Sequence, residues 1–428
     1  MSMSGSSMLK KLDWVTILLY LILVFFGWVN IYSTTFVDAD VSVFDMSTRY
    51  GKQLFFVGAS LVFIIIILAI ENSFFERFAS LFYIISIVLL LGLFLFGKKI
   101  GGAISWYDLG FFNFQPSELG KLTTALALAK YLSDIQTDLR KGKHQWYAVL
   151  ILLIPIILIL PQPDPGSALV YFSLFFVLFR EGMPLKYLGF ALMLILLFVC
   201  TLKYGVIWVV IGMGILTSLF FLFKKPQLKI PTLPLILFLV ASLVVSLSVD
   251  FVYNNVFEQR HRDRFSLWLD LEKDPVRLEQ IKKTIGYNTY QAEKAIESGG
   301  LKGKGFLEGT RTKGDFVPEQ DTDYIFSSVG EEWGFLGTSA VVLVFSLFFL
   351  RLIMLAERQK KDFGRMYGYG IISILLTHYF VNIGMVIGLL PTIGIPLPFF
   401  SYGGSGLLFF TGMLFIFLKF DAERLSEL

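Results

Sequence analysis

The chain alternates long apolar segments with short polar connections along nearly its whole length. About twelve of these segments are candidate membrane-spanning helices, because a helix needs about 20 mostly apolar residues to cross a bilayer. They lie at residues 14–34, 53–70, 79–96, 117–132, 146–160, 167–179, 185–202, 205–223, 230–249, 324–355, 367–390 and 406–420. Residues 257–323 differ, forming one long polar stretch rich in acids, bases, aromatic residues and glycines. The pattern predicts an all-α polytopic membrane protein with one large loop.

The composition supports this class and argues against several others. Of the 428 residues, 55% are hydrophobic and 16% aromatic, which is more apolar surface than a soluble core can bury. The net charge is only +4 and the basic residues form short clusters, which argues against nucleic-acid binding. The single cysteine, Cys200, excludes an intrachain disulfide, and three scattered histidines argue against a zinc site. The first apolar segment is of full spanning length and has no convincing cleavage site, so we interpret it as a retained span and not as a signal peptide.

The basic residues predict which loops face the cytoplasm, because lysine and arginine concentrate there. With twelve spans and both termini inside, nearly all basic clusters fall on the cytoplasmic side. These clusters are Lys10 and Lys11; Arg140, Lys141 and Lys143; Arg180 and Lys186; Lys224 and Lys225; Arg358, Lys360, Lys361 and Arg365. Residues 97–116, 161–166, 257–323 and 391–405 then face outward, and only Lys98 and Lys99 depart from the rule.

Two helix starts on the outward side carry charged residues. After Pro116, Glu118 and Lys121 are three residues apart, so they share a helix face and can pair. The pair is either a capped helix end or part of a polar cavity, because charges within a span usually mark a site. Asp164, in the break P-Q-P-D-P-G-S, has the same two interpretations, as the N-cap of the next helix or as a cavity residue.

The long loop offers the strongest catalytic candidates. Asp270, Glu272 and Asp274 lie close in sequence to Arg262 and Arg264. Carboxylates accept a proton from a sugar hydroxyl or hold a divalent cation at a pyrophosphate, and arginine forks bind phosphate oxygens. The alternative is a set of solvated charges in a loop that faces water.

Further polar residues gather toward the C-terminal end of the chain. Glu319, Asp321, Asp323, Glu331 and Glu332 surround the start of the segment 324–355, which is more acid than helix capping requires. The later loop P-T-I-G-I-P-L-P-F-F-S-Y-G-G-S-G is rich in proline and is a candidate re-entrant segment. On the helix before it, His378 and Asn382 are expected to bond each other or a neighbouring helix.

Taken in order, the motifs resemble those of one family over nearly the whole chain. They are F-Q-P-S-E-x-x-K, Q-P-D-x-G-S, S-G-G-L-x-G-K-G, P-E-x-x-T-D-Y-I-F, G-E-E-x-G-F-x-G, N-I-G-M and P-L-P-F-x-S-Y-G-G-S. This order resembles the SEDS family, the shape, elongation, division and sporulation proteins. The N-I-G-M tract is more similar to the rod-shape branch than to the division branch. Members usually have ten spans, so the count here implies an added pair.

The resemblance implies a peptidoglycan glycosyltransferase of the bacterial cytoplasmic membrane. It would polymerise lipid II into glycan strands at the outer face, working with a class B penicillin-binding protein, with Mg²⁺ or Mn²⁺ as candidate cofactor and no organic cofactor. Asp274 matches the essential acid of the family's long loop, and we expect it to be the catalytic base. The positions expected to bind substrate are Trp106, Gln115, Ser117, Glu118, Lys121, Asp164, Arg262, Arg264, Asp270, Glu319, Thr322, Asp323, Ser401, Tyr402 and Gly403.

Two other functions remain open from the residues alone. A lipid II flippase would need a cavity that opens alternately to both faces, with no dependence on an outer carboxylate. A non-catalytic scaffold would need no reactive loop, and the crowding of Asp270 and Asp274 with Arg262 and Arg264 argues against it. A channel or small-solute transporter is disfavoured, because few charges lie within the spans to define a pathway.

Overall fold

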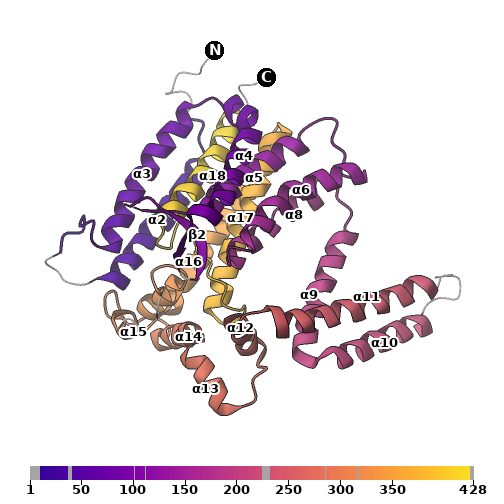
Figure 1. The fold of residues 1–428 in the computed structure, drawn as a ribbon. Coiled ribbons are helices and arrows are strands. Elements are labelled where there is room, and N and C mark those ends of the chain that lie inside the picture. Colours follow the sequence, from indigo (N-terminus) through magenta and orange to yellow (C-terminus); the bar gives the residue numbers. More distant parts are fainter. Residues whose placement is uncertain are drawn as a thin grey trace. The chain divides into compact units, whose positions relative to one another are not determined.

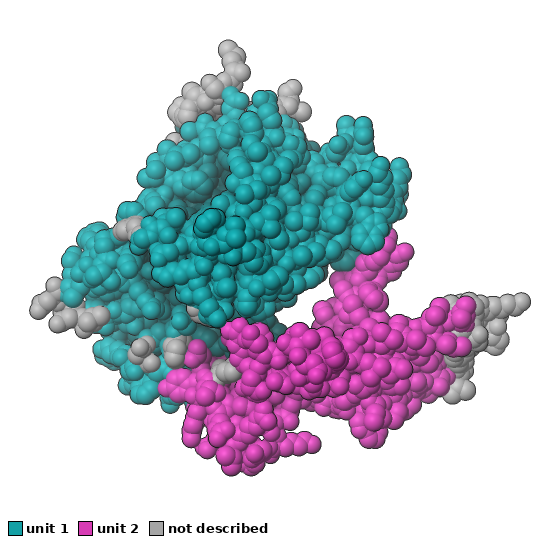
Figure 2. Space-filling view, in the orientation of Figure 1, with its two compact units in different colours: residues 1–183, 291–428 teal, residues 184–290 magenta. Residues whose placement is uncertain are grey.

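The computed structural model describes residues 10–36, 41–100, 102–110, 112–223, 232–284, 286–314, 316–317 and 319–424. The chain divides into two compact units (Figure 2). Unit 1 comprises residues 1–183 and 291–428, and unit 2 comprises residues 184–290. The start of the predicted segment 230–249 and the basic residues Lys224 and Lys225 lie outside the described residues.

Unit 1 is a bundle of helices connected mostly by short turns (Figure 1). Its long helices are α2 (Trp14–Thr35), α3 (Arg49–Ala69), α4 (Asn72–Phe96), α5 (Pro116–Leu132), α6 (Gly142–Ile159), α16 (Ile325–Glu357), α17 (Asp362–Val386) and α18 (Gly404–Glu423). Its short helices are α7 (Pro165–Phe172), α8 (Phe175–Arg180) and α15 (Thr310–Lys313). Asp13 at the start of α2 and Asp421 near the end of α18 both contact Arg358, so these two helix ends lie together.

Helix α5 lies in the middle of unit 1, against α4, α6, α17 and α18 (Figure 1). Nearly all its side chains are buried, although several are polar or small. Small residues let helices approach closely within a membrane, which accounts for its central place. Gly120 illustrates the fit, because an added Cβ would lie 2.2 Å from the hydroxyl oxygen of Tyr171. The predicted helix 117–132 is therefore an inner helix that faces protein.

A small antiparallel sheet precedes α5, which the sequence pattern did not predict. Its three strands are β1 (Lys98–Ile100), β2 (Ala103–Asp108) and β3 (Asn113–Phe114), in the order β1-β2-β3. Lys98 pairs with Trp106 and Tyr107 pairs with Phe114. The Tyr107 hydroxyl donates to the carbonyl oxygen of Leu89 at 2.8 Å, which joins the sheet to α4.

Unit 2 contains three apolar helices followed by part of the long loop. The apolar helices are α9 (Lys186–Tyr204), α10 (Val206–Phe223) and α11 (Thr232–Phe251), and α11 continues into the short π-helix η1 (Val252–Val256). The loop then forms α12 (Gln259–Leu269), α13 (Pro275–Lys283) and α14 (Tyr287–Gly299), which runs on into unit 1. Helices α9, α10 and α11 pack on one another, and the hydroxyls of Thr201 and Ser246 are 3.1 Å apart.

Every predicted apolar segment is mostly helical where the structure describes it, although the predicted segment 367–390 continues beyond α17, which ends at Val386. Among the described residues, nine helices are long and apolar enough to cross a membrane. Helix α5 has 17 residues, and the apolar stretches Pro165–Arg180 and Val206–Leu219 are also shorter. The predicted segment 167–179 is divided, because α7 ends at Phe172 and α8 begins at Phe175. The all-α membrane architecture is confirmed, and the number of crossings stays a prediction.

The glycine-rich part of the long loop packs closely on a kink in α16. The kink is at Gly334, where φ is +64° and ψ is −160°. Gly303 has a φ of +81°, and an added Cβ there would lie 2.1 Å from the carbonyl oxygen of Glu332. The amide of Lys304 also donates to the carbonyl oxygen of Glu331 at 3.0 Å. Glycine at position 303 supplies both the positive φ and the space.

We expect Gly303→Ala to destabilise the protein by about 2–4 kcal/mol, because alanine is strained at a positive φ and its Cβ would overlap the carbonyl oxygen of Glu332. Thermal unfolding of the purified protein in detergent measures this change. The matched control is Gly58→Ala in α3, where an added Cβ meets nothing within 4 Å. Alanine has the higher helix propensity, so the control should keep or raise the stability. Equal melting temperatures for the two variants would contradict the close packing described here.

Candidate functional site

A buried ion pair lies at the N-terminal end of α5. Lys121 Nζ is 2.6 Å from Glu118 Oε1, and both side chains are almost fully buried. Lys121 Nζ also lies 2.9 Å from His378 Nε2 on α17. The other carboxylate oxygen of the pair, Glu118 Oε2, is buried with no hydrogen-bond partner within the described residues. The predicted pairing is confirmed, and it leaves the second carboxylate oxygen without a partner among the described residues.

His378 connects this pair to the proline-rich loop before α18. A lysine ammonium has no acceptor, so it donates to Nε2, and the proton of the neutral ring is then on Nδ1. His378 Nδ1 lies 3.1 Å from the carbonyl oxygen of Pro396, to which it donates. On the same helix, Asn382 Nδ2 donates to the carbonyl oxygens of Asp323 at 2.8 Å and Ile395 at 2.7 Å. His378 and Asn382 therefore bond other segments rather than each other.

Asp164 caps α7 and contacts the residue before α5. Its carboxylate accepts from the amide of Ser167 at 3.0 Å and from the Ser167 hydroxyl at 2.8 Å. Gln115 Nε2 donates to Asp164 Oδ2 at 3.1 Å. The hydroxyls of Ser117 and Ser167 lie 3.3 Å apart. The capping interpretation is thus confirmed, and the cap lies beside the start of α5. We call Gln115, Ser117, Glu118, Lys121, Asp164 and His378 the inner polar cluster.

The loop before α18 joins the chain that leads into α16. The hydroxyl of Ser401 donates to the carbonyl oxygen of Thr322 at 2.6 Å. The amide of Tyr402 donates to the carbonyl oxygen of Asp321 at 2.8 Å, and the amide of Gly403 donates to Gln53 Oε1 at 3.2 Å. The structure therefore brings Thr322, Ser401 and Tyr402 together. Glu319 accepts from the Thr322 hydroxyl at 3.0 Å, which extends the group.

Asp321 is the most buried acid of this group. Its carboxylate pairs with Arg49 at 2.5 Å, and only 2% of its side chain is exposed, against 53% for Arg49. Burial raises the pKa of the Asp321 carboxyl, and the guanidinium of Arg49 opposes that rise. Burial also raises the pKa of the neighbouring Tyr402 hydroxyl. The partly exposed guanidinium of Arg49 thus stabilises the ionised form of the Asp321 carboxylate at this buried position.

We expect Arg49→Gln to destabilise the protein by about 1–2 kcal/mol at neutral pH. This is less than for a fully buried pair, because water screens a half-exposed arginine. The loss should vanish as the pH falls through the raised pKa of Asp321, because a protonated carboxyl needs no cation. Melting temperatures of both proteins across an acid-to-neutral pH series test this, with Arg77→Gln as an exposed control. A pH-independent difference would contradict the pairing.

Glu331 and Glu332 are engaged within the fold. Glu331 accepts from Lys304 Nζ at 2.7 Å, and from the amide and hydroxyl of Thr312 at 2.8 and 2.7 Å. Glu331 therefore accepts hydrogen bonds from the first turn of α15. Glu332 accepts from the hydroxyl of Ser33 on α2. Glu331 therefore holds the glycine-rich part of the loop against α16, whereas Glu332 joins α16 to α2.

In unit 2, the predicted catalytic acid begins a helix. Asp274 is exposed, and its Oδ1 accepts from the amide of Val276 at 3.0 Å as the N-cap of α13. Glu272 accepts from the Asp274 amide at 3.2 Å and pairs with Arg277 at 3.1 Å. Asp270 ends α12 in the left-handed region, with a φ of +55°.

Arg262 and Arg264, also in unit 2, both lie on α12. Arg262 Nη1 donates to the carbonyl oxygen of Asn254 at 3.1 Å. The remaining predicted substrate residues belong to unit 1, where Trp106 lies on β2. The predicted site residues are therefore divided between the units: Asp274, Asp270, Arg262 and Arg264 belong to unit 2, and the others belong to unit 1.

Three residues that contact the predicted site were missed as site residues. His378 bonds Lys121, Gln53 bonds Gly403 and Arg49 pairs with Asp321. A signal existed for His378, because an ionisable residue within a span is a functional candidate by default. Arg49 and Gln53 begin a span, where flanking polar residues are common, so their local pattern did not single them out.

Comparison with known proteins gives consistent matches along the chain. A family model described as cell cycle protein (FTSW_RODA_SPOVE) matches residues 13–229 and 209–425. Peptidoglycan glycosyltransferase MrdB from Escherichia coli K12 is 32% identical over 399 residues, covering 93% of this chain and 90% of that protein. Peptidoglycan glycosyltransferase RodA from Treponema pallidum is also 32% identical, over 418 residues, covering 92% and 94%.

Solved structures match the same architecture. A chain from a structure on the coordination of polymerization and crosslinking by a peptidoglycan synthase complex is 25% identical, with a TM-score of 0.71. That match covers 97% of this chain and 99% of the other. The rod shape determining protein RodA of Thermus thermophilus, at 23% identity and a TM-score of 0.60 over 97% and 98%, supports the fold alone.

Proposed function

The chain belongs to the FtsW, RodA and SpoVE family of cell cycle proteins and is a peptidoglycan glycosyltransferase, and from this premise we propose that it polymerises lipid II during cell elongation. The reaction takes place at the outer face of the bacterial cytoplasmic membrane, with both chain termini in the cytoplasm. The observation that carries the proposal is the inner polar cluster, in which a buried lysine pairs with a carboxylate within a membrane bundle, and the second oxygen of that carboxylate has no partner in the part of the chain that the structure describes. Buried charges of this kind in membrane proteins are usually functional.

Asp274 is the catalytic base in this proposal. Its carboxylate takes the proton from the 4-hydroxyl of the acceptor sugar, whose oxygen attacks the anomeric carbon of the donor. The bond from that carbon to the pyrophosphate oxygen breaks, and undecaprenyl pyrophosphate leaves with the electron pair, so the configuration inverts. An exposed carboxylate at the start of α13 is open to solvent and substrate, which suits this role.

The other predicted residues bind the two lipid-linked sugars. Arg262 and Arg264 provide guanidinium groups for the pyrophosphate, whose charge grows as the bond breaks. Glu118 Oε2 and Lys121 provide an acceptor and a charge for the sugar headgroup. Trp106, Gln115, Ser117, Asp164, Asp270, Glu319, Thr322, Asp323, Ser401, Tyr402 and Gly403 complete the proposed substrate-binding set.

A divalent cation is a further part of the proposal. No group of three or more histidine, cysteine, aspartate or glutamate side chains gathers in the described parts of the chain as a metal cage. Mg²⁺ commonly binds through one or two carboxylates together with phosphate oxygens, so this arrangement still accommodates it. Asp270 is the carboxylate that would hold it, because Glu272 already pairs with Arg277. The cation would neutralise pyrophosphate charge.

The proposed partner is a class B penicillin-binding protein that crosslinks the new glycan strands. The structural match to a chain of a peptidoglycan synthase complex supports an assembly of this kind. Both the growing strand and the partner would engage the outward side, where the long loop is predicted to lie. The partner's identity follows from co-purification, and its effect on the reaction follows from the assay below.

Labelled lipid II incubated with the purified full-length chain tests the function. We expect glycan ladders in the presence of a cognate class B penicillin-binding protein whose transpeptidase is blocked, and none without the chain. The alternative, a lipid II flippase, predicts transfer of lipid II across vesicles without polymer. Transfer without any ladder would therefore overturn the proposed polymerase.

A further inference from the structure

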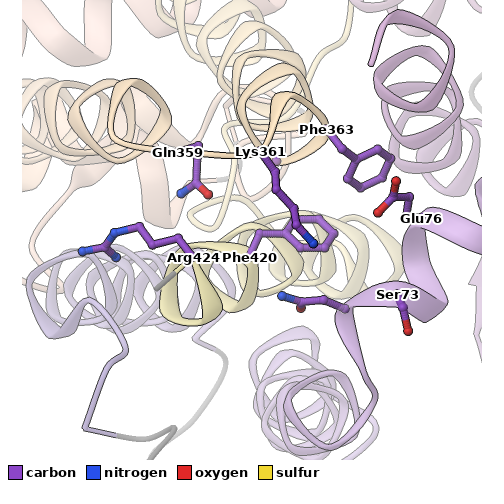
Figure 3. A pocket seen from close by; sticks show the side chains of 9 residues that line it. Ser73, Glu76, Gln359, Lys361, Phe363, Phe420 and Arg424 are labelled. Carbon is purple, nitrogen blue, oxygen red and sulfur yellow. The ribbon is translucent and has the colours of Figure 1, made fainter. Parts of the chain in front are cut away.

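A small pocket lies between the ends of three helices in unit 1, outside the inner polar cluster (Figure 3). It has a volume of about 60 Å³ and is bounded by the first turns of α4 and α17 and the last turn of α18. This is room for about four water-sized groups. Phe363 and Phe420 form one wall, with ring centroids 5.3 Å apart. Gly364 contributes backbone only, and an added Cβ would lie 3.2 Å from Gln359 Oε1.

One side of the pocket donates hydrogen bonds. Within the described structure, the side chains of the N-cap residues of α17 and α4, Lys361 and Glu71, make no cap hydrogen bond. The first amide groups of a helix have no intrahelical acceptor, so both helix ends favour a negatively charged group. Figure 3 shows Lys361 extending over the ring of Phe420, whereas Arg424 points away. Arg424 is engaged with Asp421, at 3.0 Å. Lys361 and Arg424 are thus both cations of the lining, and of the two Lys361 extends over the wall formed by Phe420.

The other side of the pocket accepts hydrogen bonds. Asn72, the first residue of α4, lines the pocket and is 91% buried, since only 9% of its surface is exposed. Its Oδ1 is buried and has no hydrogen-bond partner in the described structure. Glu76, one turn further along α4, adds an exposed carboxylate to the same lining. The lining therefore combines a carboxylate with a buried acceptor that has no partner among the described residues. Such a lining favours a cationic hydrogen-bond donor, which a simple anion does not supply.

We propose that this pocket binds the phosphoethanolamine headgroup of a membrane phospholipid. The phosphate lies at the helix N-termini and Lys361, and the ammonium donates to Asn72 Oδ1 and Glu76. The pocket lies where α4, α17 and α18 end, and all three are membrane-span candidates, so it is at headgroup level. Under the predicted sidedness, this is the cytoplasmic leaflet, opposite the proposed polymerisation site. The lipid would fasten three helix ends together.

Native mass spectrometry of the full-length protein in detergent tests the proposal with four probes. These are phosphatidylethanolamine, phosphatidylcholine, phosphatidylglycerol and soluble glycerophosphoethanolamine. Phosphatidylcholine keeps the phosphate and the positive charge but lacks ammonium donors, so we expect it to bind about tenfold more weakly. Glycerophosphoethanolamine lacks acyl chains and should bind at least about tenfold more weakly than phosphatidylethanolamine.

Two variants assign the binding to this pocket. Glu76→Gln removes the carboxylate at an exposed position, and Asn72→Leu removes the orphan acceptor. Each should abolish the preference for phosphatidylethanolamine over phosphatidylcholine, whereas the neighbouring exposed control Arg77→Gln should keep it. Glu76→Gln should leave lipid II polymerisation unchanged, which separates this proposal from the proposed function. If Asn72→Leu does not fold, Glu76→Gln alone decides the assignment.

Several outcomes would overturn the proposal. Equal binding of phosphatidylglycerol and phosphatidylethanolamine would mean a plain anion site. Equal binding of glycerophosphoethanolamine would assign the pocket to a soluble compound. A preference for phosphatidylethanolamine that persists in Glu76→Gln would mean that the lipid binds at another site. If the protein retains no lipid at all, the pocket holds only water.

Discussion

Asp274→Asn is expected to leave the protein folded and to reduce glycan polymerisation by at least about 100-fold, because a general base contributes about 10²–10⁴-fold. Asparagine is as good an N-cap as aspartate, so its amide oxygen can still accept from the amide of Val276 and begin α13. It cannot take up the proton of the attacking hydroxyl. The substitution therefore separates the chemical role of the side chain from its structural role.

The matched control is Glu279→Gln, five residues further along the chain in α13. Glu279 forms only a surface pair with Lys283, at 3.6 Å with both side chains 72% exposed. Its loss should change neither folding nor activity. Rates of polymer formation from labelled lipid II, together with melting temperatures, decide the outcome. Full activity in Asp274→Asn would refute the assignment of the base, and a large loss in Glu279→Gln would point to general damage of α13.

Lys121→Met is expected to destabilise the protein by about 3–5 kcal/mol, because it leaves Glu118 buried without its cation. The ammonium lies 2.6 Å from Glu118 Oε1 and 2.9 Å from His378 Nε2, so a single change removes both contacts. Thermal or denaturant unfolding in detergent measures the effect. The comparison is Lys98→Gln, which breaks the exposed pair with Asp108 and should cost at most about 1 kcal/mol.

The double variant Glu118→Gln with Lys121→Met separates the two interpretations of this pair. Removing both charges together should restore most of the stability, since neither residue is then a buried unpaired ion. If the pair only offsets its own burial, polymerisation should return with the fold. We expect activity to stay at least about tenfold low, because the headgroup loses a charge-assisted contact. Recovery of full activity would make the pair structural.

Local interactions were well predicted because they depend on residues close in sequence. Glu118 and Lys121 share a helix face whatever surrounds them, and Asp164 precedes a proline and a glycine that favour a capped helix start. Both expectations are confirmed by the distances. The apolar segments were predicted for the same reason, since bilayer thickness sets their length.

Partners from distant parts of the chain were not predictable in this way. His378 is 257 positions from Lys121, and Gln53 is 350 positions from Gly403. Nothing in the local pattern of α17 or α3 indicates those contacts, because they depend on which helices pack together. The sheet was missed because β1 and β3 have only three and two residues, and the six residues of β2, A-I-S-W-Y-D, do not alternate between apolar and polar.

The amino-acid sequence by itself determined the membrane class of this protein, its helices, its family motifs and the carboxylates on which the proposed chemistry depends. These properties follow from apolar length and local spacing. Tertiary structure alone decided that α5 lies inside the bundle, that Lys121 meets His378, and that three helix ends enclose a polar pocket. The physical reason is that burial and hydrogen-bond partners depend on how helices pack, and packing joins residues that the chain keeps far apart.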